Sequence, residues 1–99
     1  MKYIKELPDL TTLLGSRTLG KVLRLFLERP GQWYSRQVGF WVQEDHRNVW
    51  RSLQALERLG LLVSWRKGRL RLYQANRSCS LFFPLRSLLL RLSRRGARR

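Results

Sequence analysis

The stretch HRNVWRSLQALERLGLLVSWRKGRLRLYQAN, residues 46–76, decides the expected fold of this 99-residue chain. In its first half, residues 46–59, apolar side chains recur three and four residues apart, which predicts an amphipathic helix that buries them. These side chains are Val49, Leu53, Leu56 and Leu59. Asp45 can cap the start of this helix, and Gly60 suits the left-handed backbone at which a helix ends.

The second half of the stretch predicts a β-hairpin. Residues 61–65 and 69–74 are rich in strand-forming side chains and flank the turn-forming tripeptide Arg66-Lys67-Gly68. In the second strand leucine alternates with arginine, so we expect one face to be buried and the other to be cationic. The alternating residues are Leu70 and Leu72 on one face and Arg69 and Arg71 on the other.

Upstream of this stretch, residues 17–29 predict another amphipathic helix, since apolar side chains recur there at the same spacing. Ser16 is its expected N-cap, and Pro30-Gly31 ends it. Residues 7–14 are expected to form one or two further helical turns before it.

A short strand and a short helix are expected between these segments. Trp33 and Tyr34 favour β structure, and Ser35 can cap a helix over residues 36–42. We expect Gly39 to lie where this helix crosses its neighbour closely, so that a side chain there would push the two apart.

The C-terminal part returns to helical spacing over residues 81–93. Pro84 is tolerated because it falls in the first turn, and residues 94–99 form a basic tail that is expected to fray. The expected apolar stripe is Leu81, Leu85, Leu88, Leu89 and Leu92. We therefore expect a single domain over residues 1–93, followed by the tail.

The order of these elements indicates a mainly α fold with a β-hairpin wing. Two helices joined by a tight turn and followed by a basic hairpin are the arrangement of a winged helix-turn-helix.

The charge of the chain points to an anionic partner. Lys and Arg number 21 against 6 Asp and Glu, a formal net charge of +15. Residues 58–99 contain 12 of these basic side chains and no acidic one. One compact domain with this charge repels itself unless an anion is near, which favours nucleic acid or an acidic membrane surface.

Several classes of protein are excluded by what the sequence lacks. A single cysteine, Cys79, excludes an internal disulfide framework and a thiolate-rich zinc site. No secretory signal and no membrane-length apolar run is present, so we expect a soluble cytoplasmic protein. No carboxylate pair, metal cluster or phosphate-binding loop accompanies the lone His46, so we expect no enzyme, no cofactor and no metal.

Residues 12–93, including the run from Glu44 to Asn76, resemble the small ArsR-like winged helix-turn-helix DNA-binding domains of prokaryotic transcriptional regulators. The resemblance implies a regulator that binds double-stranded DNA. Two departures from the family pattern are visible. The turn Val42-Gln43-Glu44-Asp45 lacks the usual glycine and is acidic, and the chain has too few Cys and His residues for metal sensing.

The candidate DNA-binding residues follow from this arrangement. In a helix-turn-helix the second helix enters the major groove, and its N-terminal residues meet base edges. Opposite the buried stripe of helix 46–59 lie His46, Arg47, Asn48 and Arg51, together with Trp50. Arginine can pair with guanine and asparagine with adenine. A solvated helix face is the alternative interpretation.

Two further groups are expected to hold the DNA backbone. The hairpin bears Arg66, Lys67, Arg69 and Arg71, which we expect on phosphates or in the minor groove. The start of helix 36–42 bears Ser35, Arg36 and Gln37, which can bind phosphate. Cations that protect an edge strand from aggregation, and simple helix capping, are the respective alternatives.

The remaining apolar residues suggest contacts with other chains. The C-terminal helix has more leucine than a small core can cover, so we expect a homodimer built from the N- and C-terminal helices. A basic amphipathic helix on a membrane surface is the rival interpretation. Either Phe40 or Trp41 is expected to pack under the N-terminal segment, although an exposed partner-binding patch is an alternative.

Three functions stay open at this point. The leading hypothesis is a homodimeric, sequence-specific, nucleoid-associated transcriptional regulator, with helix 46–59 in the major groove and the hairpin on the backbone. The second is an architectural protein that coats DNA without choosing sequence. The third is a winged helix that contacts proteins.

Overall fold

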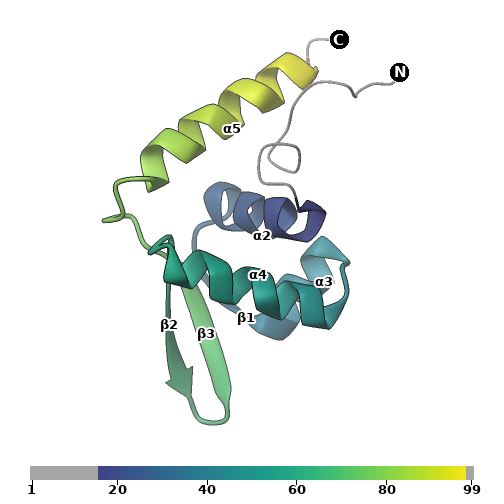
Figure 1. The fold of residues 1–99 in the computed structure, drawn as a ribbon, viewed down its shortest axis with the longest axis vertical. Helices are drawn as coiled ribbons and strands as arrows, with labels where there is room; N and C mark the ends of the chain where they lie inside the picture. Colours follow the sequence, from purple (N-terminus) through teal and green to yellow (C-terminus); the bar gives the residue numbers. More distant parts are fainter. Residues whose placement is uncertain (1–15, 98–99) are drawn as a thin grey trace.

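The structure, a computed structural model, describes residues 16–97 (Figure 1). The elements follow the order α2 (Arg17–Glu28), β1 (Gln32–Tyr34), α3 (Ser35–Val42), α4 (His46–Arg58), β2 (Leu62–Lys67), β3 (Leu70–Ala75) and α5 (Phe82–Ala97). This confirms the mainly α fold with a β-hairpin. The helical turns expected over residues 7–14 lie outside the described residues.

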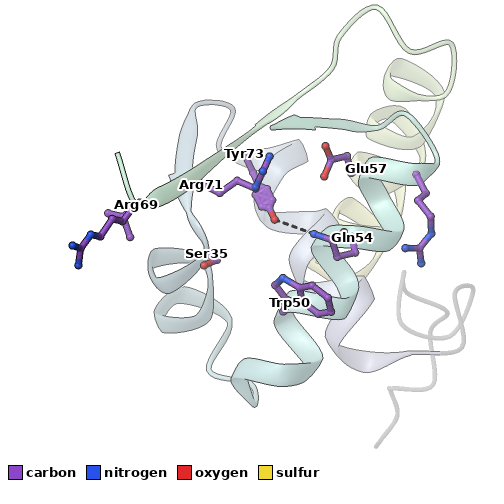
Figure 2. Close-up of a pocket in the computed structure, with 9 residues that line it drawn as sticks. Ser35, Trp50, Gln54, Glu57, Arg69, Arg71 and Tyr73 are labelled. Carbon is purple, nitrogen blue, oxygen red and sulfur yellow. Dashed lines mark hydrogen bonds between the residues drawn. The ribbon is translucent and has the colours of Figure 1, made fainter. Parts of the chain in front are cut away.

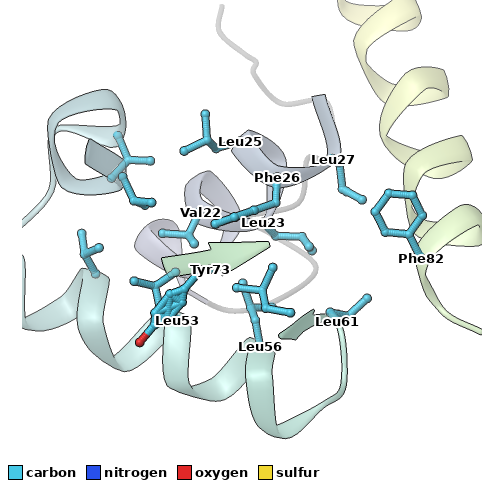
Figure 3. Packing of buried hydrophobic residues seen from close by; sticks show 14 of the residues in the cluster. Val22, Leu23, Leu25, Phe26, Leu27, Leu53, Leu56, Leu61, Tyr73 and Phe82 are labelled. Carbon is cyan, nitrogen blue, oxygen red and sulfur yellow. The ribbon is translucent and has the colours of Figure 1, made fainter. Parts of the chain in front are cut away.

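The helices α2, α3 and α4 pack around one apolar core, which the hairpin closes from one side (Figure 3). The most completely buried side chains include Phe26 of α2, Val38 of α3, Leu53 of α4 and Tyr73 of β3. Truncation of such a side chain to alanine typically costs about 2–5 kcal/mol. The core therefore fixes α4 against both the other helices and the hairpin.

The three strands form an antiparallel sheet in the order β1-β3-β2. Lys67 pairs with Leu70, so the hairpin turn consists of Gly68 and Arg69, not of the tripeptide 66–68 that the sequence predicted. Gly68 has a φ of +65°, which suits the first position of a two-residue hairpin loop. Arg66 and Lys67 consequently belong to strand β2.

The expected alternation of buried leucine and exposed arginine along β3 is only partly correct. Leu70 is exposed, whereas the consecutive residues Leu72 and Tyr73 are both buried. Leu72 lies between its cross-strand partners Trp65 and Tyr34 on the outer face of the sheet. Tyr73 points to the opposite face, toward the helices. The central strand thus buries one side chain on each face.

The helix ends largely confirm the capping predictions. The Ser16 hydroxyl accepts a hydrogen bond from the backbone N–H of Leu19 (3.2 Å), and the Asp45 carboxylate accepts one from that of Arg47 (3.1 Å). Gly60 has the expected positive φ, +85°. Ser35, however, is the first residue of α3 and not its cap. The side-chain oxygen of Gln37 instead accepts from the Tyr34 N–H (2.9 Å).

The turn between α3 and α4 works without a glycine. Gln43 adopts the left-handed conformation (φ 53°, ψ 51°), which costs a residue with a Cβ about 1 kcal/mol. Its N–H donates to the Gly39 carbonyl, as a glycine at a helix C-cap would do. Gln43 therefore makes the same turn as a glycine would, at the cost of some backbone strain.

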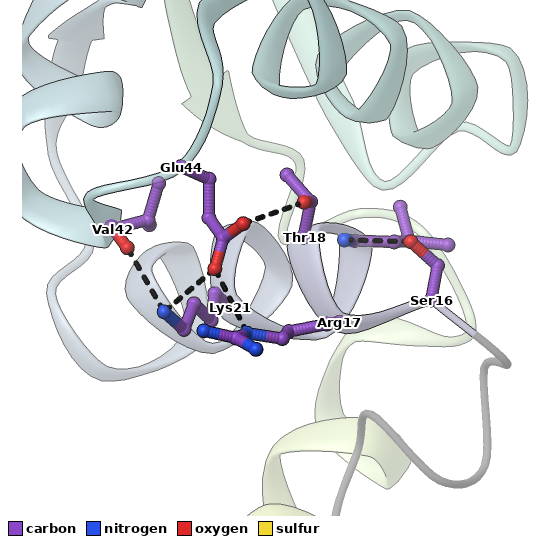
Figure 4. Close-up of polar contacts among 7 residues, drawn as sticks. Ser16, Arg17, Thr18, Lys21, Val42 and Glu44 are labelled. Atoms are coloured by element: carbon purple, nitrogen blue, oxygen red, sulfur yellow. Dashed lines mark hydrogen bonds and ion pairs between the residues drawn. The ribbon is translucent and has the colours of Figure 1, made fainter.

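Of the two acidic residues in this turn, Asp45 is exposed and caps α4, whereas Glu44 points toward α2, as Figure 4 shows. The Glu44 carboxylate lies 2.8 Å from Lys21 Nζ and 3.1 Å from Arg17 Nε, and it accepts a hydrogen bond from the Thr18 hydroxyl (3.2 Å). Only 14% of its side chain is exposed. The hydrogen bond from Lys21 is the main cause of its lowered pKa. Glu44 thus ties the turn to α2.

Two predictions within α3 and α4 are wrong. Leu59 is 58% exposed, because α4 ends at Arg58 and Leu59 occupies its C-cap. A Cβ added to Gly39 would meet no atom within 4 Å, so this glycine is not required by a close helix crossing.

Helix α5 also differs from its prediction. It continues to Ala97, through part of the expected tail, and its first turn buries Phe82 while Leu81 stays exposed. Phe82 and Leu89 join the core, and Figure 3 shows Phe82 beside Leu27 of α2. Pro84 lies in the first turn, as predicted. In the described part of the chain, none of the helices has the length and apolar character needed to cross a membrane.

Candidate nucleic-acid interface

One stripe of α4 points away from the core and bears three arginines. Arg47, Arg51, Gln54 and Arg58 follow one another at steps of four, three and four residues, opposite the buried Val49, Leu53 and Leu56. The three arginines are exposed, and none forms an ion pair with another residue of the described part. Their guanidinium groups are therefore available to an anionic partner.

Beside this stripe, a groove of about 780 Å³ separates α4 from the hairpin (Figure 2). Trp50, Gln54, Glu57 and Arg58 line it from α4. The residues on the other sides are Ser35 of α3 and Arg69, Leu70, Arg71 and Tyr73 of the hairpin. The lining contains three arginines and one carboxylate, so its surface favours anions.

Two side-chain contacts hold the hairpin to α4. Gln54 Nε2 donates to the Tyr73 hydroxyl (3.3 Å), a contact drawn in Figure 2. The Ser64 hydroxyl donates to the Glu57 carboxylate (2.7 Å) and accepts from Arg71 Nη1 (2.9 Å). Burial raises the pKa of Tyr73, so its phenol stays neutral at physiological pH. These contacts fix the width of the groove before any ligand arrives.

The cations of the hairpin are divided between its two faces. Arg66 lies directly opposite Arg71 across the strands, on the face that Tyr73 shares and that borders α4. Like charges directly opposite each other are destabilising, and an anion between them would relieve this repulsion. Lys67, opposite Leu70, belongs to the outer face by the alternation of side chains, and although Leu70 reaches the groove next to the turn, Lys67 does not line it. The hairpin therefore does not present its cations as a single group.

The other predicted residues lie at the margins of the groove. Ser35 lines it, and Arg36 is exposed one residue further along α3. Gln37 is exposed, but its side chain already caps α3. His46 opens α4, and Asn48 lies on the flank of α4 that faces away from the hairpin; both are exposed.

Gln54 and Arg58 extend the site beyond the residues that the sequence singled out. A helical period continued from Arg47 and Arg51 leads directly to both of them, so the signal was present in the sequence. Glu57 gave no comparable signal, because its partner Ser64 lies on a different element. Among the described residues, no group of three or more His, Cys, Asp or Glu side chains is placed to hold a metal ion.

Comparison with solved structures supports the fold. A structure reported as giving insights into the DNA recognition and protein interaction domains of HOP2 matches with a TM-score of 0.57. The match covers 60% of this chain and 98% of that chain, at 21% sequence identity. The fold is a winged helix. In winged-helix terms α3 and α4 are the helix-turn-helix, α4 is its second helix, and β2 and β3 are the wing.

The sequence comparisons add no family. No protein-family model matches the chain, and the curated proteins contain no significant match. The winged-helix fold is thus established at the level of architecture, while the ArsR-like resemblance is not confirmed.

Proposed function

We propose that this protein binds double-stranded DNA through α4 and the wing. The observation that carries the proposal is the row of arginines on α4, Arg47, Arg51 and Arg58, which form no ion pair within residues 16–97 and lie beside a cationic groove. An α-helix fits the major groove, where arginine can pair with guanine. With α4 in the major groove, the wing arginines would approach the sugar–phosphate backbone. The DNA recognition domain of HOP2, which shares the fold, supports the same conclusion.

Within this function we propose a sequence-specific transcriptional regulator that acts by covering its operator in the cytoplasm, on the nucleoid. The side chains on the exposed side of α4 support sequence reading, because arginine and the amide of Asn48 are the types that discriminate bases. Contacts to phosphate alone need only positive charge and would not require an asparagine amide beside the arginines on the helix.

We further propose that the protein acts as a homodimer through its terminal helices. Phe83 and Leu90 of α5 are large, apolar and about half exposed, and a second copy would cover them. A two-fold dimer would place two copies of α4 about 34–36 Å apart, one turn of DNA. Sedimentation equilibrium tests this directly, and a monomer at all concentrations used for DNA binding would contradict it.

Two other functions have observations in their favour. An architectural, sequence-tolerant DNA-coating protein is favoured by the absence of any acidic residue from 58–99. A protein-contact module is favoured by Phe40, which is 76% exposed, and by its neighbour Trp41.

Selection of bound duplexes from a random pool distinguishes these functions. The proposal expects an enriched motif, with two half-sites about 10 base pairs apart for the dimer. Binding without an enriched motif would establish the coating protein. If no duplex is retained at about 50 mM salt, where phosphate contacts are strong, DNA binding itself is wrong and the protein-contact module becomes the function.

A further inference from the structure

Trp50 is an unusual residue on the proposed DNA-reading helix. The apolar side chains Val49, Leu53 and Leu56 of α4 are buried, whereas Trp50 is 51% exposed. It lines the groove between α4 and the wing, and Figure 2 shows its indole on α4 one turn before Gln54. A large aromatic surface is thus presented in a groove whose other exposed lining is polar or charged, apart from Leu70 of the wing.

The neighbours of Trp50 place it among base-contacting groups. On a helix, residues three and four positions apart share a face. His46 and Arg47 precede Trp50 by these distances, and Gln54 follows it. When such a face enters the major groove, hydrogen-bonding groups surround the indole. The apolar group that base edges offer in this groove is the 5-methyl group of thymine.

Stacking on unpaired bases is the other common use of an exposed tryptophan, and the groove does not favour it. Binding of single strands relies on several aromatic side chains that stack on successive bases. Among the residues that line this groove, Tyr73 is the second aromatic, and it is 1% exposed with its hydroxyl bonded to Gln54. One accessible ring suits a single apolar contact to a duplex.

We propose that Trp50 is a specificity-determining residue that contacts the 5-methyl group of a thymine in the major groove. The duplex that this protein prefers therefore carries thymine at the position facing the indole. This inference rests on the proposed DNA-binding function and adds one base to its specificity.

The test removes a single methyl group from the DNA. The full chain first selects a duplex from a random pool, and each thymine of the selected site is then replaced in turn by deoxyuridine. We expect one position per half-site at which the wild type loses about fourfold in affinity, the factor for one buried methyl group. Trp50→Ala and Trp50→Gln should bind thymine and deoxyuridine equally well at that position.

The matched control is Trp41→Ala. Trp41 is 50% exposed, almost the same fraction as Trp50, but it lies on α3 outside the groove. Trp41→Ala should keep the full preference for thymine. Melting curves of the three variants confirm that each is folded, and two different side chains at position 50 guard against a variant that fails to fold.

The outcomes separate this inference from the function on which it rests. Wild-type binding that is indifferent to deoxyuridine at every position, or position-50 variants that keep the preference, would overturn the role of Trp50 and leave DNA binding intact. A pool that yields no enriched motif would also overturn it, because no position would then be read. Failure to retain any duplex would overturn both.

Discussion

The two sides of this small domain treat their positive charges in different ways. On α2, the cations Arg17, Lys21 and Arg24 are paired with the carboxylates of Glu44 or Glu28 at 2.8–3.1 Å. On α4, Arg47 and Arg51 have no carboxylate partner within the described residues. Glu44 thus joins the α3–α4 turn to α2 and Glu28 pairs within α2, whereas no described carboxylate pairs with the outer stripe of α4. The net charge of the chain alone could not reveal this division.

The largest effect is expected when the same amount of positive charge, two arginines, is removed either from α4 or from α2. Replacement of both Arg47 and Arg51 by alanine should lower the affinity for the selected duplex roughly 30-fold or more, because each base contact contributes about 1–3 kcal/mol. The double variant Arg17→Ala/Arg24→Ala removes the same charge from the paired side. Fluorescence anisotropy at one salt concentration should show little loss for it. Similar losses for the two variants would mean that only net charge matters.

The second prediction concerns the two faces of the wing. Arg66 borders α4 whereas Lys67 lies on the outer face, so Arg66→Ala should remove a phosphate contact and Lys67→Ala should not. For Arg66→Ala we expect the slope of log K against log salt to become shallower by about 0.9. A salt titration of both variants measures this. A shallower slope for Lys67→Ala than for Arg66→Ala would mean that the outer face of the wing contacts the DNA.

The third prediction tests how much the ion pairs of Glu44 with α2 contribute to stability. Glu44→Gln should lower the melting temperature at neutral pH, since it removes the charge that Lys21 and Arg17 share. The pKa of Glu44 is lowered from 4.5, so its contribution to stability is present above that pH and is lost as the pH falls through the lowered value.

Melting curves of the wild type and of Glu44→Gln across the acidic range measure this effect. The difference between the two melting temperatures should shrink as the pH falls below 4.5, the ordinary pKa of a glutamate carboxyl. A constant difference down to the strongly acidic range would contradict the assignment. DNA affinity at neutral pH should not change, in contrast to the α4 variants.

The smallest effect concerns α3, which packs against both α2 and α4. A Cβ at Gly39 meets open space, so Gly39→Ala should stabilise the protein by about 0.5–1 kcal/mol through the better helix propensity of alanine. Urea unfolding measures the change. Gly60→Ala is the matched control, and it should destabilise because Gly60 has a φ of +85°. If Gly39→Ala instead lowered the stability, the result would support the interpretation from the sequence, in which a close helix crossing requires a glycine at this position.

The sequence predicted those features that depend on neighbouring residues. The period of apolar side chains gave α2 and α4, and the caps at Ser16 and Asp45 were read from local chemistry. The positive φ of Gly60 followed in the same way. The outward position of Arg47 and Arg51 was predicted too, because a helix repeats its faces every three to four residues.

Features that depend on residues far apart in the chain came only from the tertiary structure. The partners of Glu44 lie 26 and 27 residues away at Thr18 and Arg17, and no local pattern indicates them. The register of β2 on β3 decided that Arg66 borders α4 and that Lys67 does not. A shift by one residue would reverse both faces, so a strand pattern alone cannot assign them.

The charge of +15 was therefore fixed by the sequence, and its distribution by the fold. Composition counts cations but does not say which of them meets a carboxylate. That depends on the packing of α2 against the α3–α4 turn and of the wing against α4, since contacts between distant segments form only when the core closes. The sequence thus determined the elements and the excess charge, and the tertiary structure determined which cations remain available.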